Sequence, residues 1–206
     1  MPGSIGLAAH KISCQRGGGV LFENLSFALK PGEGLLVTGP NGAGKTSLLR
    51  QIAGLLPLDA GALDVPGAGP DDRLPELCHY VGHANGIKTA LSVRENVAFW
   101  AEFLGSKPKG LKAVLDGFAL GALADLPAGI LSAGQKRRLA LTRLLAATRP
   151  IWLLDEPSVS LDDRSTELVY RAIVLHLAAG GIAIVASHAA PGLTFKHRLK
   201  LGERVR

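Results

Sequence analysis

Short runs of apolar residues, separated by polar or glycine-rich turns, recur along this chain and predict a mixed α/β domain. Gly34–Thr38 and Leu77–Val81 are predicted as strands, and so is the apolar run that ends at Ser187–His188. Ile151–Leu154 is a run of four apolar residues between Pro150 and two carboxylates, which is typical of a buried parallel strand. Parallel strands need crossover segments, usually helices, between them.

Helical patterns occupy the segments between these strands. Ser92–Leu104 begins with a serine and has Glu95 three residues later, which is the capping-box pattern of an amphipathic helix. Ser132 precedes a leucine-rich segment with a basic C-terminal end, so Ser132 is predicted to be a helix N-cap. Further helices are predicted at Ser47–Leu56, Leu111–Leu123 and Asp162–Leu177.

The N-terminal part of the chain has a different pattern. Three short apolar runs, Ile5–Ala9, Val20–Phe22 and Leu25–Leu29, predict an antiparallel sheet at the edge of the core. Gly61–Asp72 is rich in Gly, Pro and Asp and is predicted to be a connecting loop. The sequence has no internal repeat and no linker, so residues 1–206 are interpreted as a single domain.

Composition narrows the class of protein. Hydrophobic residues make up 47% of the chain, yet no apolar run approaches the roughly 18–20 residues of a membrane span. The N-terminus lacks the pattern of a signal peptide, and Cys14 and Cys78 are too few for a disulfide scaffold or a zinc site. We therefore expect a chain that neither crosses the membrane nor leaves the cytoplasm by itself.

The net charge of +6, from 23 basic and 17 acidic residues, suits a nucleic acid or an anionic membrane surface equally well. The basic residues are scattered, and aromatic residues make up only 5% of the chain, so a base-stacking platform is not indicated. The charge favours proximity to a membrane, and no nucleic-acid partner is expected.

The most specific chemistry lies in Gly39–Thr46, GPNGAGKT, which fills every fixed position of a G-x-x-x-x-G-K-[ST] phosphate-binding loop. Between a strand and a helix, such a loop directs backbone N–H groups at phosphate oxygens. Lys45 is predicted to reach the β- and γ-phosphates, and the Thr46 hydroxyl to ligate Mg²⁺. The candidate nucleotide-binding residues are Gly39, Pro40, Asn41, Gly42, Ala43, Gly44, Lys45, Thr46 and Ser47.

Two adjacent carboxylates follow the strand predicted at Ile151–Leu154. Asp155 is expected to hold Mg²⁺, directly or through water, and Glu156 is the candidate general base for an attacking water. The alternative is that both carboxylates only cap the next helix. Two further residues have a purely structural interpretation. Ser132 would then serve only as an ordinary helix cap, and a lone histidine after a strand, such as His188, is usually structural.

Three motifs in fixed order carry a family resemblance: Gly39–Thr46, LSAGQ at Leu131–Gln135, and WLLDEP at Trp152–Pro157. Together they resemble the ATP-binding cassette (ABC) family over nearly the whole chain, with Ala133 replacing a usual glycine. The resemblance implies an α/β P-loop ABC ATPase fold with a RecA-like core, an antiparallel β edge subdomain and a helical subdomain at about 88–148. It also implies that two copies face head to tail and share two ATP molecules.

The family pattern assigns further roles to residues of this sequence. ATP bound to one copy would be contacted by the other copy through Ser132, Ala133, Gly134, Gln135 and Asp162. His188 falls at the place of the switch histidine that contacts the γ-phosphate, so the resemblance implies that Glu156 and His188 are catalytic. The implied cofactors are ATP and Mg²⁺, with Thr46 and Asp155 as metal ligands.

Two positions depart from the family pattern. His83 stands where the Q-loop glutamine is expected, with Asn85 close by as an alternative amide. The aromatic residue that stacks on adenine is absent, and Arg16 falls near its place. We interpret His83 as the coupling-loop residue; the alternative is an exposed loop residue without such a role.

The segment Tyr80–Trp100, and in particular the tract His83–Thr89, resembles the ATP-binding subunits of cytochrome c maturation haem exporters. This resemblance implies a peripheral subunit on the cytoplasmic face of a bacterial inner membrane, bound to integral membrane subunits of a cytochrome c maturation complex. Direct haem binding is not expected.

Two other functions are alternatives to that of a haem-exporter subunit. A soluble cassette ATPase acting on nucleic acid or ribosomes usually has two cassettes or a long coiled-coil insertion, and this sequence has neither. A P-loop kinase or GTPase would leave LSAGQ unexplained, and the sequence has no N-K-x-D guanine-reading motif.

Overall fold

The computed structural model describes residues 5–106, 110–188 and 192–202. The chain divides into two compact units. The sheet unit comprises Met1–Tyr80, Arg149–Glu156 and Ile173–Arg206, and the helical unit comprises Val81–Thr148 and Pro157–Ala172. The mixed α/β class predicted from the sequence is confirmed.

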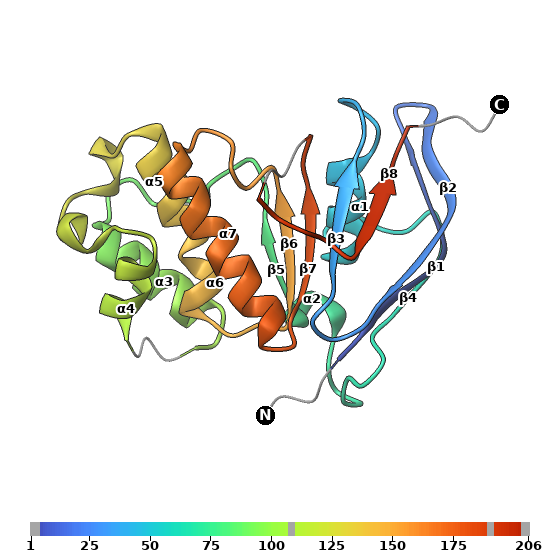
Figure 1. Cartoon of the computed structure of the whole chain (residues 1–206), viewed down its shortest axis with the longest axis horizontal. Coiled ribbons are helices and arrows are strands. Elements are labelled where there is room, and N and C mark those ends of the chain that lie inside the picture. The colour runs from blue at the N-terminus through green and yellow to red at the C-terminus, as the bar shows by residue number, and fades with distance from the viewer. Residues whose placement is uncertain (1–4, 107–109, 189–191, 203–206) are drawn as a thin grey trace. The chain divides into compact units, whose positions relative to one another are not determined.

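A five-stranded sheet forms the centre of the sheet unit (Figure 1), in the order β5-β6-β7-β3-β8. β3 pairs in parallel with β7 and β8, and β6 pairs in parallel with β7. All five residues of β6 and of β7 are buried, which agrees with the apolar sequence of both strands up to Asp155, the last residue of β6. The strands are β3 (Gly34–Thr38), β5 (Cys78–Val81), β6 (Ile151–Asp155), β7 (Ile182–Ala186) and β8 (His197–Lys200).

A separate three-stranded antiparallel sheet, in the order β2-β1-β4, completes the sheet unit. The predicted antiparallel sheet is confirmed, although its first two strands are long and interrupted by register shifts: β1 spans Leu7–Arg16 and β2 spans Gly19–Leu29. The prediction of a loop throughout Gly61–Asp72 is wrong, because β4 (Ala60–Asp64) pairs with β1 there.

Close backbone approach explains the glycine in β4. Gly61 has φ 84°, and a Cβ atom on it would lie 2.4 Å from the carbonyl oxygen of His10. A residue type that suggests a turn in the sequence therefore serves here to let two strands meet.

Helix α1 (Lys45–Ile52) supplies the main helical contribution to the core of the sheet unit, and α2 is a short helix at Leu74–Leu77. Leu48, Leu49 and Ile52 of α1 are fully buried in one cluster with Val37 of β3 and Ile184 of β7. This packing fixes the start of α1 against the end of β3.

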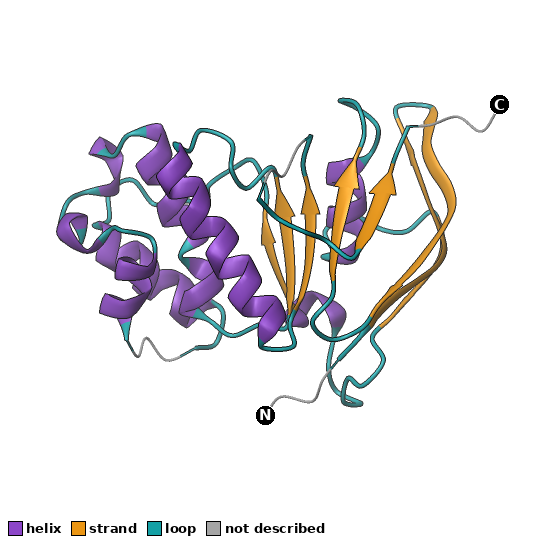
Figure 2. Cartoon of the chain, viewed as in Figure 1, coloured by secondary structure: helices purple, strands orange, loops and turns teal. Residues whose placement is uncertain are grey.

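Helices dominate the helical unit (Figure 2). The capping box at the start of α3 is confirmed, since Ser92 Oγ accepts from the Glu95 N–H and the Glu95 carboxylate accepts from the Ser92 N–H. The elements are α3 (Val93–Phe103), α4 (Leu111–Gly117), the 3-10 turns η1 (Gly121–Leu123) and η2 (Ala128–Ile130), α5 (Ala133–Leu141), α6 (Arg143–Ala146) and the first part of α7 (Asp163–Ala178).

Two predicted helices are interrupted. The helix expected over Leu111–Leu123 ends at Gly117, and Ala119 then takes a left-handed conformation with φ 52°. The helix after Ser132 breaks at the buried Thr142, whose hydroxyl donates to the Leu139 carbonyl at 2.7 Å. Such a bond back to the preceding turn competes with the regular helical pattern.

A carboxylate on the loop before β3 gives a first testable prediction. Lys196 donates to Glu33, as do the Lys30 N–H and His197, and these contacts lower the pKa of Glu33 from 4.5 to about 2. Because the folded-state pKa is lowered, this stabilisation is complete above pH 4.5 and is lost as the pH falls towards 2. We expect Glu33→Gln to lower the melting temperature at pH 7 and to flatten its decrease between these pH values.

Circular dichroism melts at a series of pH values measure this effect. The control is Glu76→Gln, which removes an exposed carboxylate of α2. If Glu33→Gln and the control had the same pH profile as the unsubstituted chain, the contribution of the Glu33 contacts would be refuted.

Candidate active site

The glycine-rich loop joins the end of β3 to the start of α1 and has the backbone geometry that its sequence predicts. Gly39 has φ 143°, and a Cβ atom on it would lie 2.5 Å from the Leu201 carbonyl oxygen. Gly44 is the left-handed N-cap of α1, and a Cβ atom there would crowd Leu21 and Phe22. The first N–H groups of α1 therefore open into the turn made by the loop, where the helix dipole favours an anion.

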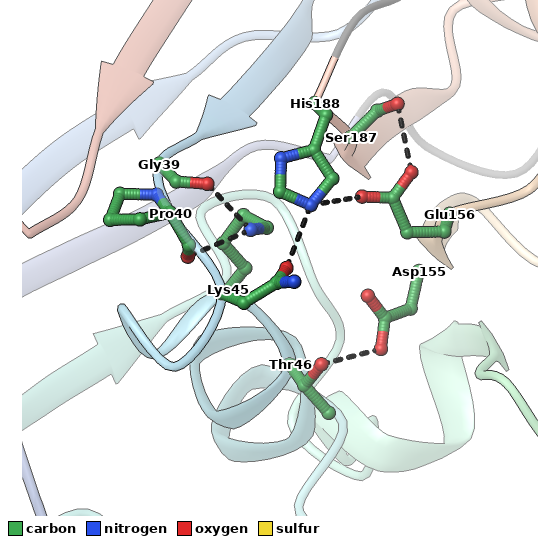
Figure 3. A network of polar contacts seen from close by, with 9 residues as sticks. Gly39, Pro40, Lys45, Thr46, Asp155, Glu156, Ser187 and His188 are labelled. Carbon is green, nitrogen blue, oxygen red and sulfur yellow. Dashed lines mark hydrogen bonds and ion pairs between the residues drawn. The ribbon is translucent and has the colours of Figure 1, made fainter.

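The Lys45 side chain curls back over this loop (Figure 3), so that Nζ donates to the carbonyl oxygens of Gly39 at 2.7 Å and Pro40 at 3.1 Å. The residue is only 7% exposed. The two carbonyl groups hold this ammonium over the glycine-rich loop, where a P-loop binds phosphate oxygens.

Thr46 and Asp155 meet beside this lysine (Figure 3), although 109 residues separate them in the sequence. The Thr46 hydroxyl donates to Asp155 Oδ2 at 2.7 Å, and Asp155 is 1% exposed. Among the described residues no cluster of three His, Cys, Asp or Glu side chains could hold a metal ion. A single hydroxyl and carboxylate pair fits Mg²⁺, which usually binds one or two carboxylates together with substrate phosphates and water.

Glu156 directly follows β6 and has a strained backbone, with φ 47° in the left-handed region. Its N–H donates to the Ala186 carbonyl at 2.9 Å, and its Oε2 accepts from the Ser187 hydroxyl at 3.0 Å. Non-glycine residues in this conformation cost of order 1–3 kcal/mol and cluster at functional sites. The backbone strain and the serine contact together fix the direction of this carboxylate.

His188 lies between the loop and Glu156. Its Nε2 is 2.9 Å from Asn41 Oδ1 and 3.7 Å from Glu156 Oε1, and the imidazole is more than half exposed. In the tautomer with a proton on Nε2, the ring donates to Asn41. Three segments that are far apart in the sequence therefore converge on one point of the sheet unit (Figure 3).

Sequence reasoning missed Ser187 as a partner of Glu156. The available signal was the pairing of two parallel buried strands, since Asp155 of β6 lies opposite Ala186 of β7. The residues that follow the two strands, Glu156 and Ser187, then also become neighbours.

The residues expected to act on a second copy lie in the helical unit. Ser132 Oγ accepts from the Gln135 N–H at 3.2 Å, while Gln135 Oε1 accepts from the Ser132 N–H at 2.8 Å, so the predicted N-cap is confirmed. A Cβ atom on Gly134 would lie 3.0 Å from the Ser160 carbonyl oxygen. Asp162 accepts from the Ser165 side chain and N–H, and these bonds lower the pKa of Asp162.

The two departures from the family pattern also have defined places. His83 is exposed in the loop after β5, and the neighbouring Asn85 turns its amide oxygen towards Arg137 Nη1 at 3.3 Å. Arg16 is exposed at the end of β1. A stacking role for Arg16 and a coupling role for His83 stay predictions.

Comparison with known proteins shows the family of this chain. The model of the ABC transporter family matches residues 22–159. Curated proteins named cytochrome c biogenesis ATP-binding export protein CcmA are similar over most of their length. The protein from Rhodopseudomonas palustris (strain BisB5) is 49% identical over 187 residues, 91% of this chain and 94% of its own. The protein from Chelativorans sp. (strain BNC1) is 49% identical over 199 residues, 95% and 98% of the two chains.

This chain belongs to the CcmA family of ABC transporter ATPases. Solved structures support the fold. A putative ABC transporter ATP-binding protein from Pyrococcus furiosus superposes with a TM-score of 0.80 at 23% identity, covering 95% of this chain and 97% of its own. The ADP conformation of the ATP-binding cassette MJ1267 has a TM-score of 0.77 at 20% identity, covering 96% and 87%. The ABC ATPase fold predicted from the sequence is confirmed.

Proposed function

We propose that this chain is the ATP-hydrolysing subunit of an ABC-type membrane complex that exports haem or otherwise serves cytochrome c maturation. The observation that carries the proposal is the convergence of Lys45, the Thr46–Asp155 pair and the Glu156–His188 pair in the sheet unit. The names of the curated relatives favour this function over that of a soluble ATPase acting on nucleic acid or ribosomes.

In the proposed reaction, the loop and the first turn of α1 bind the ATP phosphates through their N–H groups. The Lys45 ammonium exchanges the Gly39 and Pro40 carbonyl groups for β- and γ-phosphate oxygens and stabilises the charge that develops on them. Thr46 and Asp155 would hold Mg²⁺, which neutralises phosphate charge when bound.

Glu156 acts as the general base on the attacking water. As the water oxygen bonds to the γ-phosphorus, the bond from phosphorus to the β,γ-bridging oxygen breaks, ADP leaves, and Glu156 takes the water proton. The Ser187 hydroxyl orients the carboxylate, and His188 contacts the γ-phosphate from the position it takes beside Asn41.

The shared-site part of the proposal concerns a second copy of this chain. Ser132 begins α5 and leaves N–H groups of its first turn available for a γ-phosphate, as the helix dipole favours. Through Ser132, Ala133, Gly134, Gln135 and Asp162, one copy would complete the ATP site of the other.

The membrane part of the proposal places the chain on the cytoplasmic face of a bacterial inner membrane, bound to integral subunits of a cytochrome c maturation complex. In the described residues, none of the helices is long and apolar enough to cross a membrane. We propose that the integral partner subunits provide the transmembrane passage and that His83 lies in the loop that couples this chain to them.

We expect His83→Ala to retain ATP binding and basal hydrolysis within a fewfold, because His83 belongs to the helical unit, whereas the Lys45–Glu156 site is built from residues of the sheet unit. The same variant should fail to support cytochrome c maturation in cells that lack the native subunit. The measurements are ATPase activity of the purified chain and covalent haem staining of c-type cytochromes.

The matched control is Ala84→Ser, a small change at the next exposed position of the loop. Full complementation by His83→Ala would exclude the coupling role. If the unsubstituted chain, expressed with its own membrane partners, failed to complement, the cytochrome c assignment would be wrong while the ATPase assignment stood.

A further inference from the structure

The loop 82–86, which carries His83, is attached to helix α5 by a buried arginine. Arg137 is 4% exposed, and its Nη1 donates to the Gly82 carbonyl at 2.7 Å and to Asn85 Oδ1 at 3.3 Å. Its Nε donates to the Pro157 carbonyl at 3.3 Å. One guanidinium thus joins α5, the His83 loop and the segment that follows Glu156 in the sequence.

A second buried arginine holds the other end of the loop. Arg143 of α6 is 7% exposed, donates through Nη2 to the Asn85 carbonyl, and stacks its guanidinium 4.0 Å from the centroid of the Trp100 indole ring. Trp100 in turn donates through Nε1 to the Gly86 carbonyl at 3.2 Å. Side chains of α3, α5 and α6 therefore all donate hydrogen bonds to carbonyl groups of this loop.

A glycine in the loop allows Trp100 and Arg143 to approach its backbone closely. Gly86 has φ 62°, and a Cβ atom on it would lie 3.1 Å from Trp100 Cζ2 and 3.3 Å from Arg143 Nη2. A glycine is required here both for the backbone conformation and for the close contact. Burial of the Arg143 guanidinium, with the nearby charge of Arg137, lowers the pKa of Arg143 to about 10.

Burying two guanidinium groups near each other is costly unless hydrogen bonds satisfy their donors. A loop that only needed anchoring could use backbone or neutral side-chain donors. Planar guanidinium groups instead fix several carbonyl groups in direction as well as distance. The two arginines thus hold the loop backbone in a defined direction relative to α5 and α6.

We infer that Arg137 and Arg143 are positioning residues that make the His83 loop move as one body with helix α5, whose N-terminus is Ser132. In this arrangement a displacement of α5 when ATP is bound reaches His83 without being absorbed by loop flexibility. The inference rests on the proposed function for its consequence in the cell, but the attachment itself can be tested in the purified chain.

The chain offers a matched control on the same helix. Arg138 follows Arg137 directly, and its Nη1 donates to the carbonyl groups of Phe118 at 3.0 Å and Ala119 at 3.1 Å. Arg138→Gln therefore removes a guanidinium that binds two carbonyl groups of the helical unit without touching the His83 loop. Arg137→Gln removes the same chemical group from the loop.

Hydrogen exchange of the full-length purified chain tests the attachment. In Arg137→Gln and in the milder Arg143→Lys, we expect amides of residues 82–88 to exchange about tenfold faster or more, while α1 is unchanged. Arg138→Gln should leave residues 82–88 at the unsubstituted rate. Unchanged exchange in both loop variants, or equal acceleration in Arg138→Gln, would overturn the inference.

The functional consequence is measured separately. Arg137→Gln should keep the basal kcat and the KM for ATP within a fewfold, yet lower cytochrome c maturation in cells about tenfold or more, and Arg143→Lys should fall between it and the unsubstituted chain. Faster loop exchange with full maturation would overturn the transmission role. If the unsubstituted chain itself failed to support maturation, the proposed function would be wrong. The hydrogen-exchange rates alone would then show whether the arginines attach the His83 loop to α5.

Discussion

Replacing Glu156 by glutamine should lower ATP hydrolysis by about 10²–10⁴-fold, the usual contribution of a general base, and should leave ATP binding intact. The amide keeps the shape of the side chain and can still accept from the Ser187 hydroxyl, but it cannot take a proton from water. The backbone of residue 156, with φ 47°, is equally strained for both residues. Steady-state phosphate release and nucleotide binding by the same purified variant measure the two effects.

The same variant reports on the shared site. Because ATP binds without being consumed, Glu156→Gln should elute as a dimer on a sizing column in the presence of ATP and Mg²⁺. Glu76→Gln is the matched control, since it makes the same substitution at an exposed position of the sheet unit outside the site and should hydrolyse ATP normally. A Glu156→Gln chain that remained monomeric with ATP would count against two copies sharing the nucleotide.

Lys45→Ala should remove most nucleotide affinity and most turnover. A hydrogen bond to a charged group is worth about 1.5–3 kcal/mol, so ATP should bind roughly ten- to a hundredfold more weakly. Turnover should fall further, by about 10²–10³-fold, because the ammonium also stabilises charge that develops during phosphoryl transfer. Titration calorimetry with ATP and steady-state hydrolysis measure these losses.

The control for this substitution is Lys112→Ala, which removes an exposed lysine of α4 whose Nζ pairs with Asp116 at 2.8 Å. The removal of the Lys45 contacts to Gly39 and Pro40 could also loosen the loop, and a melting curve of the variant shows whether the chain stays folded. Undiminished hydrolysis by folded Lys45→Ala would mean that the phosphate-binding motif has been misread.

Local sequence patterns predicted the elements that depend on local physics. The strands at Gly34–Thr38 and Ile151–Leu154 are confirmed because a buried parallel strand needs an uninterrupted apolar run. The caps at Ser92 and Ser132 are confirmed because each serine is followed three residues later by a Glu or Gln that can return the hydrogen bond.

The failures arise where contacts distant in sequence overrule the local pattern. Gly61 suggests a loop until β1 is placed beside it, and the leucine periodicity does not reveal the short interruption at Thr142, which keeps helical backbone angles. The hydrogen bonds from the arginines to the His83 loop could not be predicted from the sequence either, since Arg137 and Gly82 are 55 residues apart. By contrast, the proximity of Thr46 and Asp155 agrees with the expectation, drawn from the motifs, that both residues hold Mg²⁺.

The two tryptophans of the chain are divided between the two compact units, and each has a distinctive partner. Trp152 of the sheet unit stacks on the His176 imidazole with ring centroids 3.9 Å apart, whereas Trp100 of the helical unit lies against the Arg143 guanidinium. Each unit therefore contains its own fluorophore in a chemically different environment. A chain in which one indole is replaced by phenylalanine reports optically on the other unit alone, without any attached dye.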